Sequence, residues 1–306
     1  MPEKLDQSAQ VDSNRRPRLQ ADLALLLVAI IWGSAFVAQR AVAAKSSIFL
    51  FNGLRFLLGA IVLLPFIWIS TRRNSILTSI NRKTMPGVLL AGLLLLCGAT
   101  FQQAGLRYTT AANAGFITGL YVVFIPILQA LIWHQVPRPA IWVAALLAVL
   151  GLYLLSTGGR LALQIGDVLE LVGAIFWALH VIWIGQWVGK IHFMQLALGQ
   201  YLVCGLLSML IGLILETNLS GQLSGAAWAI IYTGIFSVGI GYTLQVAGQR
   251  VAPPADSAIL LSSEAIFAAL FGWRILGEAL DPLQLIGCGV MLAGMLLAQV
   301  DSIHVR

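Results

Sequence analysis

Long apolar runs, separated by short polar connections, fill most of this sequence. Ten such runs lie at roughly 22–41, 48–70, 86–106, 111–133, 140–157, 166–189, 194–215, 225–248, 255–275 and 282–300. Most are close to the ~20 residues that a helix needs to cross a bilayer, and the fifth is the shortest. The connections contain turn residues such as Pro253 and Pro254, and they leave no room for a separate soluble domain. The pattern predicts an all-α integral membrane protein with ten transmembrane helices.

The composition supports this prediction. Of the 306 residues, 59% are hydrophobic and 10% are charged, whereas about 25% of the residues in an ordinary soluble domain are charged. The net charge of +6 would suit a nucleic-acid partner, but the basic residues form no stripe interleaved with stacking aromatics. We therefore expect the chain to lie in a lipid bilayer and to bind no nucleic acid.

The distribution of Lys and Arg residues predicts on which side of the membrane the two termini lie. Residues 1–20 are polar, and the apolar run behind them is too long for the core of a signal peptide. We expect a disordered cytoplasmic tail over 1–20 and a retained first helix. An even number of spans puts both termini on one side of the membrane. If that side is the cytoplasm, inner segments carry twelve Lys and Arg residues and outer segments carry five. This asymmetry favours cytoplasmic termini in a plasma or bacterial inner membrane.

The chain also contains an internal repeat. The segments GATFQQAGLRYTTAA (98–112) and GYTLQVAGQRVAPPA (241–255) are identical at seven of fifteen positions, in a single register that aligns Gly98 with Gly241. We divide the chain into two five-helix repeats, 21–160 and 161–302. Because five is an odd number, the two repeats must enter the membrane in opposite directions. Inverted repeats provide two near-equivalent arrangements of one fold, which is the physical basis of alternating access around a site between the halves.

Three segments carry a resemblance to a known family. They are GLRYTTAANAGFITGLYVVFIPIL, NGLRFLLGA around Arg55, and SSEAIFAALFGWRILGEAL, which contains Glu264 and Glu278. With the two sets of five spans, the chain resembles the EamA family of the drug/metabolite transporter superfamily. The resemblance implies ten helices around a central cavity and export of small metabolites, often amino acids. Family members often have proline after the carboxylate equivalent to Glu264, where this chain has Ala265, and Gln135 stands in the first half in the place of Glu278.

Two charges stand deep inside predicted spans. Glu264 lies about ten residues from one end of its run, where a charged side chain is costly unless it is paired, protonated or hydrated. It is either a proton-coupling or gating residue that faces the cavity, or a carboxylate fixed in helix packing. Arg55 lies seven residues into its run. Its long side chain either extends to the headgroup region, or holds an anionic substrate or pairs with a carboxylate.

Aromatic and amide side chains supply the remaining candidates for the cavity. His180 shares a helical face with Trp177 and is the side chain most easily titrated near neutral pH, although a buried histidine is more often a packing residue. Trp32 forms a similar stripe with Gln39. Each of these residues either packs between helices or lines the cavity. The same two interpretations apply to Gln102 and to its repeat equivalent Gln245. The predicted substrate cavity is completed by two tyrosines, Tyr121 and Tyr242.

Function can be narrowed by exclusion. An enzyme would need a nucleophile with its base, a zinc motif or paired carboxylates, and the sequence shows none at a suitable depth. Cys97, Cys204 and Cys288 have no metal-binding spacing, so no metal or cofactor is expected. A channel would need a repeated filter or charged rings, so a passive channel is the weaker alternative and a secondary carrier is favoured.

Few deep charges, together with deep aromatics and amides, favour a small zwitterionic or neutral substrate such as an amino acid. Transport by alternating access is expected, with export as the direction and protons as a candidate coupling ion. A phosphate-sugar or nucleotide-sugar carrier is the alternative within the superfamily, but it would require several basic residues in the cavity, where only Arg55 and Arg274 are available. The sequence is compatible with a monomer or a homodimer.

Overall fold

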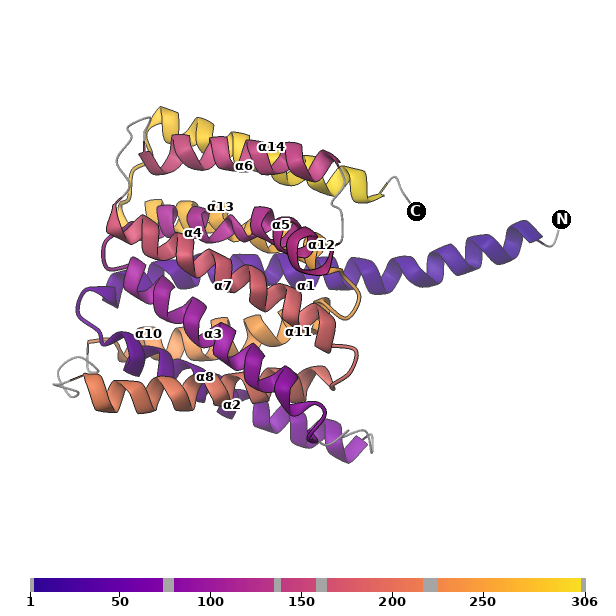
Figure 1. Cartoon of the computed structure of the whole chain (residues 1–306), viewed down its shortest axis with the longest axis horizontal. Helices are drawn as coiled ribbons and strands as arrows, with labels where there is room; N and C mark the ends of the chain where they lie inside the picture. Colours follow the sequence, from indigo (N-terminus) through magenta and orange to yellow (C-terminus); the bar gives the residue numbers. More distant parts are fainter. Residues whose placement is uncertain (1–2, 74–79, 135–138, 158–163, 217–224, 304–306) are drawn as a thin grey trace.

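The computed structural model describes residues 3–73, 80–134, 139–157, 164–216 and 225–303, and these residues form helices joined by short connections (Figure 1). No strand occurs among them. In chain order the elements are α1 Glu3–Ala43, α2 Ile48–Arg73, α3 Met85–Gly105, α4 Ala111–Gly119, α5 Tyr121–Trp133, α6 Pro139–Thr157, α7 Ile165–Trp187, α8 Phe193–Leu215, α10 Ala227–Tyr232, the π-helix η1 Thr233–Tyr242, α11 Thr243–Gly248, α12 Pro254–Ser262, α13 Glu264–Phe271, the π-helix η2 Gly272–Leu276 and α14 Pro282–Ile303.

Eight helical stretches of the described residues are long and apolar enough to cross a membrane: Arg16–Ala43, Ile48–Ser70, Met85–Gly105, Ala111–Ile132, Ile165–Trp187, Phe193–Leu215, Ala227–Gly248 and Pro254–Leu276. The protein is therefore a multi-pass membrane protein. Two shorter apolar stretches, Trp142–Gly151 and Pro282–Gly294, lie in α6 and α14, where the fifth and tenth spans are predicted. These two helices pack against each other along one edge of the bundle (Figure 1).

The N-terminal segment differs from the expected disordered tail. Helix α1 begins at Glu3 rather than after residue 20, and its first turns extend beyond the neighbouring helices (Figure 1). Arg18 helps to anchor the start of the apolar run. Its Nε lies 2.9 Å from Asp22 Oδ1 on the same helix, and its Nη2 lies 2.9 Å from Asp256 Oδ2 on α12. The polar stretch before the membrane thus continues a helix that is tied to the second half of the chain.

Two predicted spans are each divided into two helices. The fourth span changes from α4 to α5 at Leu120, and the ninth changes from α12 to α13 at Ser263. At both positions the backbone tightens, since Leu120 N donates to Ile117 O at 3.1 Å and Ser263 N donates to Leu260 O at 3.3 Å, a spacing of three residues. Leu120 and Ser263 are aligned by the same register of the sequence repeat that aligns Gly98 with Gly241.

Contacts between the helices follow the same correspondence. Helix α1 packs against η1, α12 and α13, and α7, its counterpart in the second half, packs against α3, α4 and α5. Helices α2 and α8, which also correspond, pack against each other. Gly33 permits one close approach of this kind, because a Cβ built there would lie 2.4 Å from Phe267 Cβ on α13. Helices α1 and α7 thus bring the two halves together around the middle of the bundle.

Candidate substrate cavity

A narrow cavity with a volume of about 30 Å³ lies between the two halves. Helices α1, α2, α3, α4 and α5 contribute to it from the first half, and α7, η1, α11 and α13 contribute from the second. Nine of the residues singled out in the sequence line it: Trp32, Gln39, Arg55, Gln102, Tyr121, Trp177, Tyr242, Gln245 and Glu264. His180 does not line it.

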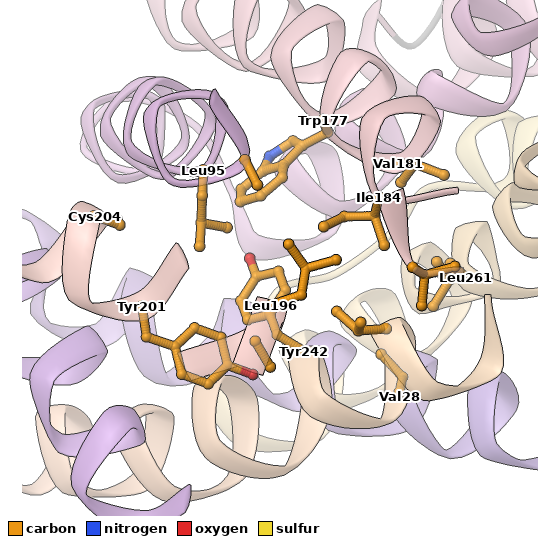
Figure 2. Close-up of a cluster of buried hydrophobic side chains, with 14 of the residues drawn as sticks. Val28, Leu95, Trp177, Val181, Ile184, Leu196, Tyr201, Cys204, Tyr242 and Leu261 are labelled. Atoms are coloured by element: carbon orange, nitrogen blue, oxygen red, sulfur yellow. The ribbon is translucent and has the colours of Figure 1, made fainter. Parts of the chain in front are cut away.

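Aromatic rings form much of the cavity wall. The ring centroid of Tyr242 lies 4.7 Å from that of Trp32 and 6.0 Å from that of Trp177. Figure 2 shows Trp177 and Tyr242 turned toward each other among apolar side chains. Trp32 Nε1 donates to Ser237 O in the π-helix at 3.1 Å, whereas the buried Trp177 Nε1 has no hydrogen-bond partner. The wall is therefore apolar with a few polar atoms free to meet a ligand.

His180 lies outside this wall. It is fully buried and its Nε2 lies 2.8 Å from Gln200 Oε1 on α8. Its ring stands edge-on to those of Trp177 and Tyr242, at 6.0 and 6.2 Å between centroids. The histidine thus supports two rings of the cavity by packing and does not face the cavity.

Arg55 is enclosed in the bundle rather than extended to the headgroups, and 1% of its surface is exposed. Its Nη1 donates to Gln39 Oε1 at 2.7 Å and its Nε donates to Asn52 Oδ1 at 3.0 Å. The guanidinium also lies over the rings of Phe51 and Phe56, at 5.4 and 5.1 Å from their centroids. Among the described residues, its Nη2 has no hydrogen-bond partner and no carboxylate forms an ion pair with the guanidinium. The neutral groups fix the guanidinium in place without neutralising its charge.

Glu264 stands at the first position of α13, and 2% of its surface is exposed. Tyr121 lines the same cavity, and its hydroxyl is placed to donate to this carboxylate. Among the described residues, neither Glu264 Oε1 nor the Tyr121 hydroxyl has a partner at full hydrogen-bond distance. Within the described ranges, no basic side chain forms an ion pair with Glu264. Arg55, for which pairing with a carboxylate was one of the alternatives, therefore forms no ion pair with Glu264 in this part of the chain, although both residues line one cavity.

The two glutamines of the repeat differ in their surroundings. Gln102 and Gln245 are both buried and both line the cavity. Neither amide atom of Gln245 has a hydrogen-bond partner, so this side chain does not make the cross-helix hydrogen bond that was one of its two interpretations. Gln39 is fixed instead, because its Nε2 donates to Ala35 O at 3.1 Å while its oxygen accepts from Arg55.

Several residues near the cavity were missed in the sequence. Asn52 holds Arg55, Thr118 and Ser237 line the cavity, and Glu170 accepts a hydrogen bond from Thr118 at 3.2 Å. Glu170 is a second fully buried carboxylate. The signal that could have found it is the one that revealed Glu264, a carboxylate inside a predicted span. Thr118 and Ser237 carry no comparable signal, because small hydroxyl side chains are common in membrane helices.

One end of the bundle is held by carboxylates of the second half. Glu278 accepts hydrogen bonds from the backbone N–H groups of Ala111 and Ala112, at 2.9 and 3.2 Å, at the start of α4. Glu216 accepts from Phe49 N and Leu50 N at the start of α2, each at 3.2 Å. Both carboxylates lie at helix N-termini, where the free N–H groups and the helix dipole favour a negative charge. They tie the two halves together at this end.

Comparison with known proteins decides the family. The model of the EamA-like transporter family matches this chain twice, over residues 19–157 and 164–299. The chain belongs to the EamA-like transporter family. An uncharacterized transporter of Archaeoglobus fulgidus is 32% identical over 285 residues, which cover 92% of this chain and 87% of that protein. The Escherichia coli threonine/homoserine exporter RhtA is 29% identical over 217 residues, or 68% of this chain and 67% of RhtA.

Further similarities agree with membership of the EamA-like family. The uncharacterized inner membrane transporter YedA of Escherichia coli is 24% identical, over 91% of this chain and 90% of that protein. A solved crystal structure superposes with a TM-score of 0.73 and 19% identity, covering 94% of this chain and 98% of the other. At that identity the match shows a shared fold. The protein is thus a membrane transporter of the EamA type.

Proposed function

We propose that this protein is a secondary active transporter that exports small zwitterionic metabolites such as amino acids by alternating access, in exchange for protons. One observation carries the proposal. Arg55 Nη2 and Glu264 Oε1 are both buried, both lack a hydrogen-bond partner, and belong to residues of opposite charge that line one cavity. An unpaired charge in such a place is costly. A substrate with a carboxylate and an ammonium group supplies both missing partners.

The surroundings of the two charges suit a small substrate. Gln39 and Asn52 hold the Arg55 guanidinium in place, so that its remaining nitrogen, Nη2, can donate to the carboxylate of a substrate. Trp32, Trp177 and Tyr242 enclose the remaining space with apolar rings. Such a wall suits a short aliphatic side chain. The similarity to RhtA, which is named a threonine/homoserine exporter, points to the same class of substrate.

Proton coupling follows from the chemistry of one carboxylate. Glu264 can neutralise its buried charge by binding either a proton or the ammonium group of the substrate. Since the two compete for the same oxygen atoms, a proton that arrives from one side displaces the substrate to that side. Exchange of one for the other needs no second ion site. An uphill flow of substrate is thereby tied to a downhill flow of protons.

Alternating access is supported by the correspondence between the two halves. Their helix breaks fall at Leu120 and Ser263, which are aligned by the sequence repeat, and α1 and α7 make corresponding sets of contacts. We take these features as two inverted five-helix repeats with ten membrane spans and cytoplasmic termini. The repeats can then exchange conformations around a site that stays fixed between them.

The anionic-sugar carrier is less well supported. Arg274 is exposed and does not line the cavity, which leaves Arg55 as its basic residue. A phosphate group would bring more negative charge to Glu264 than one guanidinium offsets. A passive channel is also disfavoured, because the cavity is crowded by rings and held at one end by Glu216 and Glu278.

Counterflow in proteoliposomes tests the proposal. Vesicles loaded with unlabelled threonine, homoserine or another amino acid should accumulate the labelled compound transiently without any ion gradient. Nucleosides and sugar phosphates serve as the comparison panel. Accumulation with amino acids and saturation at high concentration support the carrier. Accumulation only with phosphorylated sugars would identify a sugar-phosphate carrier instead. Steady flux without saturation would identify a channel.

A further inference from the structure

Gln245 is a cavity residue whose polar groups have no partner in the protein. It lies on α11, lines the cavity, and none of its surface is exposed. Among the described residues, neither its Nε2 nor its Oε1 has a hydrogen-bond partner. Burying an amide without hydrogen bonds is costly, and each of the two atoms adds to that cost. The side chain thus brings a free donor and a free acceptor to the wall of the site.

The helix that carries Gln245 is fixed by contacts on both sides of this residue. Two residues before it, Thr243 Oγ1 lies 2.9 Å from the hydroxyl oxygen of Tyr201 on α8. Three residues after it, Gly248 lies against α1, because a Cβ built there would be 2.9 Å from Leu25 Cγ. These contacts hold the face of α11 that carries Gln245 toward the cavity. Its amide is therefore placed to meet a ligand rather than a neighbouring helix.

The chemistry of a carboxamide limits what Gln245 can recognise. The group donates through its nitrogen and accepts through its oxygen. Its best counterpart is a ligand group that also donates and accepts, such as a hydroxyl or another carboxamide. A charged ligand group would meet only a neutral partner there, and a buried charge needs more than that. The amide has no proton to exchange near neutral pH, so proton exchange would not use it. Gln245 therefore suits an uncharged polar group.

The rest of the cavity leaves the side chain of the substrate to Gln245. Arg55 and Glu264 are the residues proposed to meet the carboxylate and the ammonium group that every amino acid carries. The stacked rings of Trp32 and Tyr242 restrict the length of the substrate side chain. An aliphatic side chain would bring only apolar surface to Gln245 and leave both amide atoms unpaired. A short side chain with a hydroxyl or carboxamide would give them partners.

We infer that Gln245 makes the transporter selective for amino acids with an uncharged polar side chain, a hydroxyl or a carboxamide, over aliphatic amino acids of the same size. This inference rests on the proposed export of amino acids. A site built to hydrogen-bond its ligand strongly rejects an analogue that lacks the matching group, because the groups of the protein then stay buried and unpaired. A purely apolar pocket discriminates far less between two such ligands.

Gln103 on α3 provides a matched control. It is also fully buried, and within the described part of the chain neither its Nε2 nor its Oε1 has a hydrogen-bond partner. It is not among the residues that line the cavity. Methionine at either position keeps the length of the side chain and removes both hydrogen-bonding groups. Since neither substitution breaks a hydrogen bond, both variants should fold, which elution profile and Tm check.

Calorimetry on the purified protein measures Kd for two pairs of amino acids of nearly equal size, threonine with valine and asparagine with leucine. The cavity must widen to admit any of them, since about 30 Å³ holds roughly two water molecules. Equal size within a pair removes that widening from the comparison. Wild-type protein should bind the polar member of at least one pair at least about tenfold more tightly. Gln245→Met should bring this ratio to within about threefold of one, whereas Gln103→Met should keep it.

Wild-type protein that binds amino acids without this preference would overturn the inference. So would an equal loss of affinity for both members of a pair in Gln245→Met, because Gln245 would then contact the part that all amino acids share. An equal fall of the ratio in Gln103→Met would likewise remove the role given to Gln245. If Gln245→Met does not fold, Gln245→Leu replaces it. Absence of binding and counterflow for every amino acid would instead refute the proposed function.

Discussion

Tyr121 and Glu264 occupy equivalent positions in the two halves of the chain, in the register of the sequence repeat, and their side chains interact within one cavity. Each is the first residue after the break in its span. The repeat thus places two polar groups on opposite sides of one site, and the sequence makes only one of them a carboxylate. The cavity thereby has a carboxyl group on the side of the second half and a phenol on the side of the first half.

Glu264→Gln is expected to uncouple transport from protons. The amide keeps the shape of the side chain but cannot exchange a proton. Transport driven by a pH gradient should be lost, whereas exchange of substrate for substrate should persist at higher substrate concentration, because the ammonium group loses a charged partner. Tyr121→Phe is the control and should keep gradient-driven transport. Full gradient-driven transport by the Glu264→Gln protein would make Glu264 a structural residue.

Alanine substitutions at Trp32 and His180 should distinguish a residue that contacts the substrate from one that packs between helices. Trp32→Ala removes part of the cavity wall, so substrate Kd should rise at least about tenfold, the equivalent of ~1.4 kcal/mol, while the protein remains folded. His180→Ala leaves Gln200 without its partner in a buried position, which costs about 1–3 kcal/mol of stability. Its main effect should be a lower Tm, measured in detergent together with Kd. A larger rise of Kd in His180→Ala than in Trp32→Ala would reverse these assignments.

Two exposed positions test the proposed orientation. Single cysteines at Tyr108 and at Lys190 lie in the connections after α3 and after α7. In a background without Cys97, Cys204 and Cys288, an impermeant thiol reagent should label Tyr108→Cys in intact cells and Lys190→Cys only after permeabilisation. Tags at both termini should report from the cytoplasm. Labelling of both cysteines from the same side would remove a span and break the inverted-repeat account.

Glu278 should stabilise the end of the bundle where α4 begins. Its carboxylate accepts from the first two N–H groups of that helix, so Glu278→Ala should cost about 1–2 kcal/mol and lower Tm. Loosening this end should also raise labelling of a cysteine placed at Thr118, which lines the cavity. Asp281→Ala is the control, since the carboxylate of Asp281 accepts from Gln284 in its own segment. If Glu278→Ala and Asp281→Ala changed Tm and cysteine labelling equally, Glu278 would not be the residue that stabilises this end of the bundle.

Much of the fold was predictable because apolar length and repeated motifs act locally along the chain. Nine of the residues singled out in the sequence line one cavity, and their contact with a substrate stays a prediction. The break at Leu120 was not predicted, since the sequence GLYVVF contains no proline to mark it. His180 was predicted to line the cavity because it shares a face with Trp177, yet its ring is hydrogen-bonded to Gln200 on α8 and is not among the residues that line the cavity. Sequence spacing gives a face of a helix, whereas only packing decides which edge of that face meets the cavity.

The fate of Arg55 shows the same limit. Its position in the second span was compatible with a side chain extended to the headgroups. Three neighbours decide otherwise, since Gln39 and Asn52 accept its hydrogen bonds and Phe56 lies beneath the guanidinium. Asn52 precedes Arg55 by one turn on the same helix, but Gln39 comes from another helix. A contact between helices of this kind depends on how they cross, and one sequence does not specify that crossing.

The central claim is that one substrate bridges Arg55 and Glu264, and binding of matched ligands tests it most directly. Calorimetry should compare an amino acid that shows counterflow with its amide, which lacks the carboxylate, and its N-acetyl derivative, which lacks the ammonium group. Wild-type protein should bind the amino acid at least about tenfold more tightly than either derivative. Arg55→Gln should abolish discrimination against the amide alone, and Glu264→Gln should abolish discrimination against the N-acetyl derivative alone. Discrimination that persists unchanged in both variants would contradict the account.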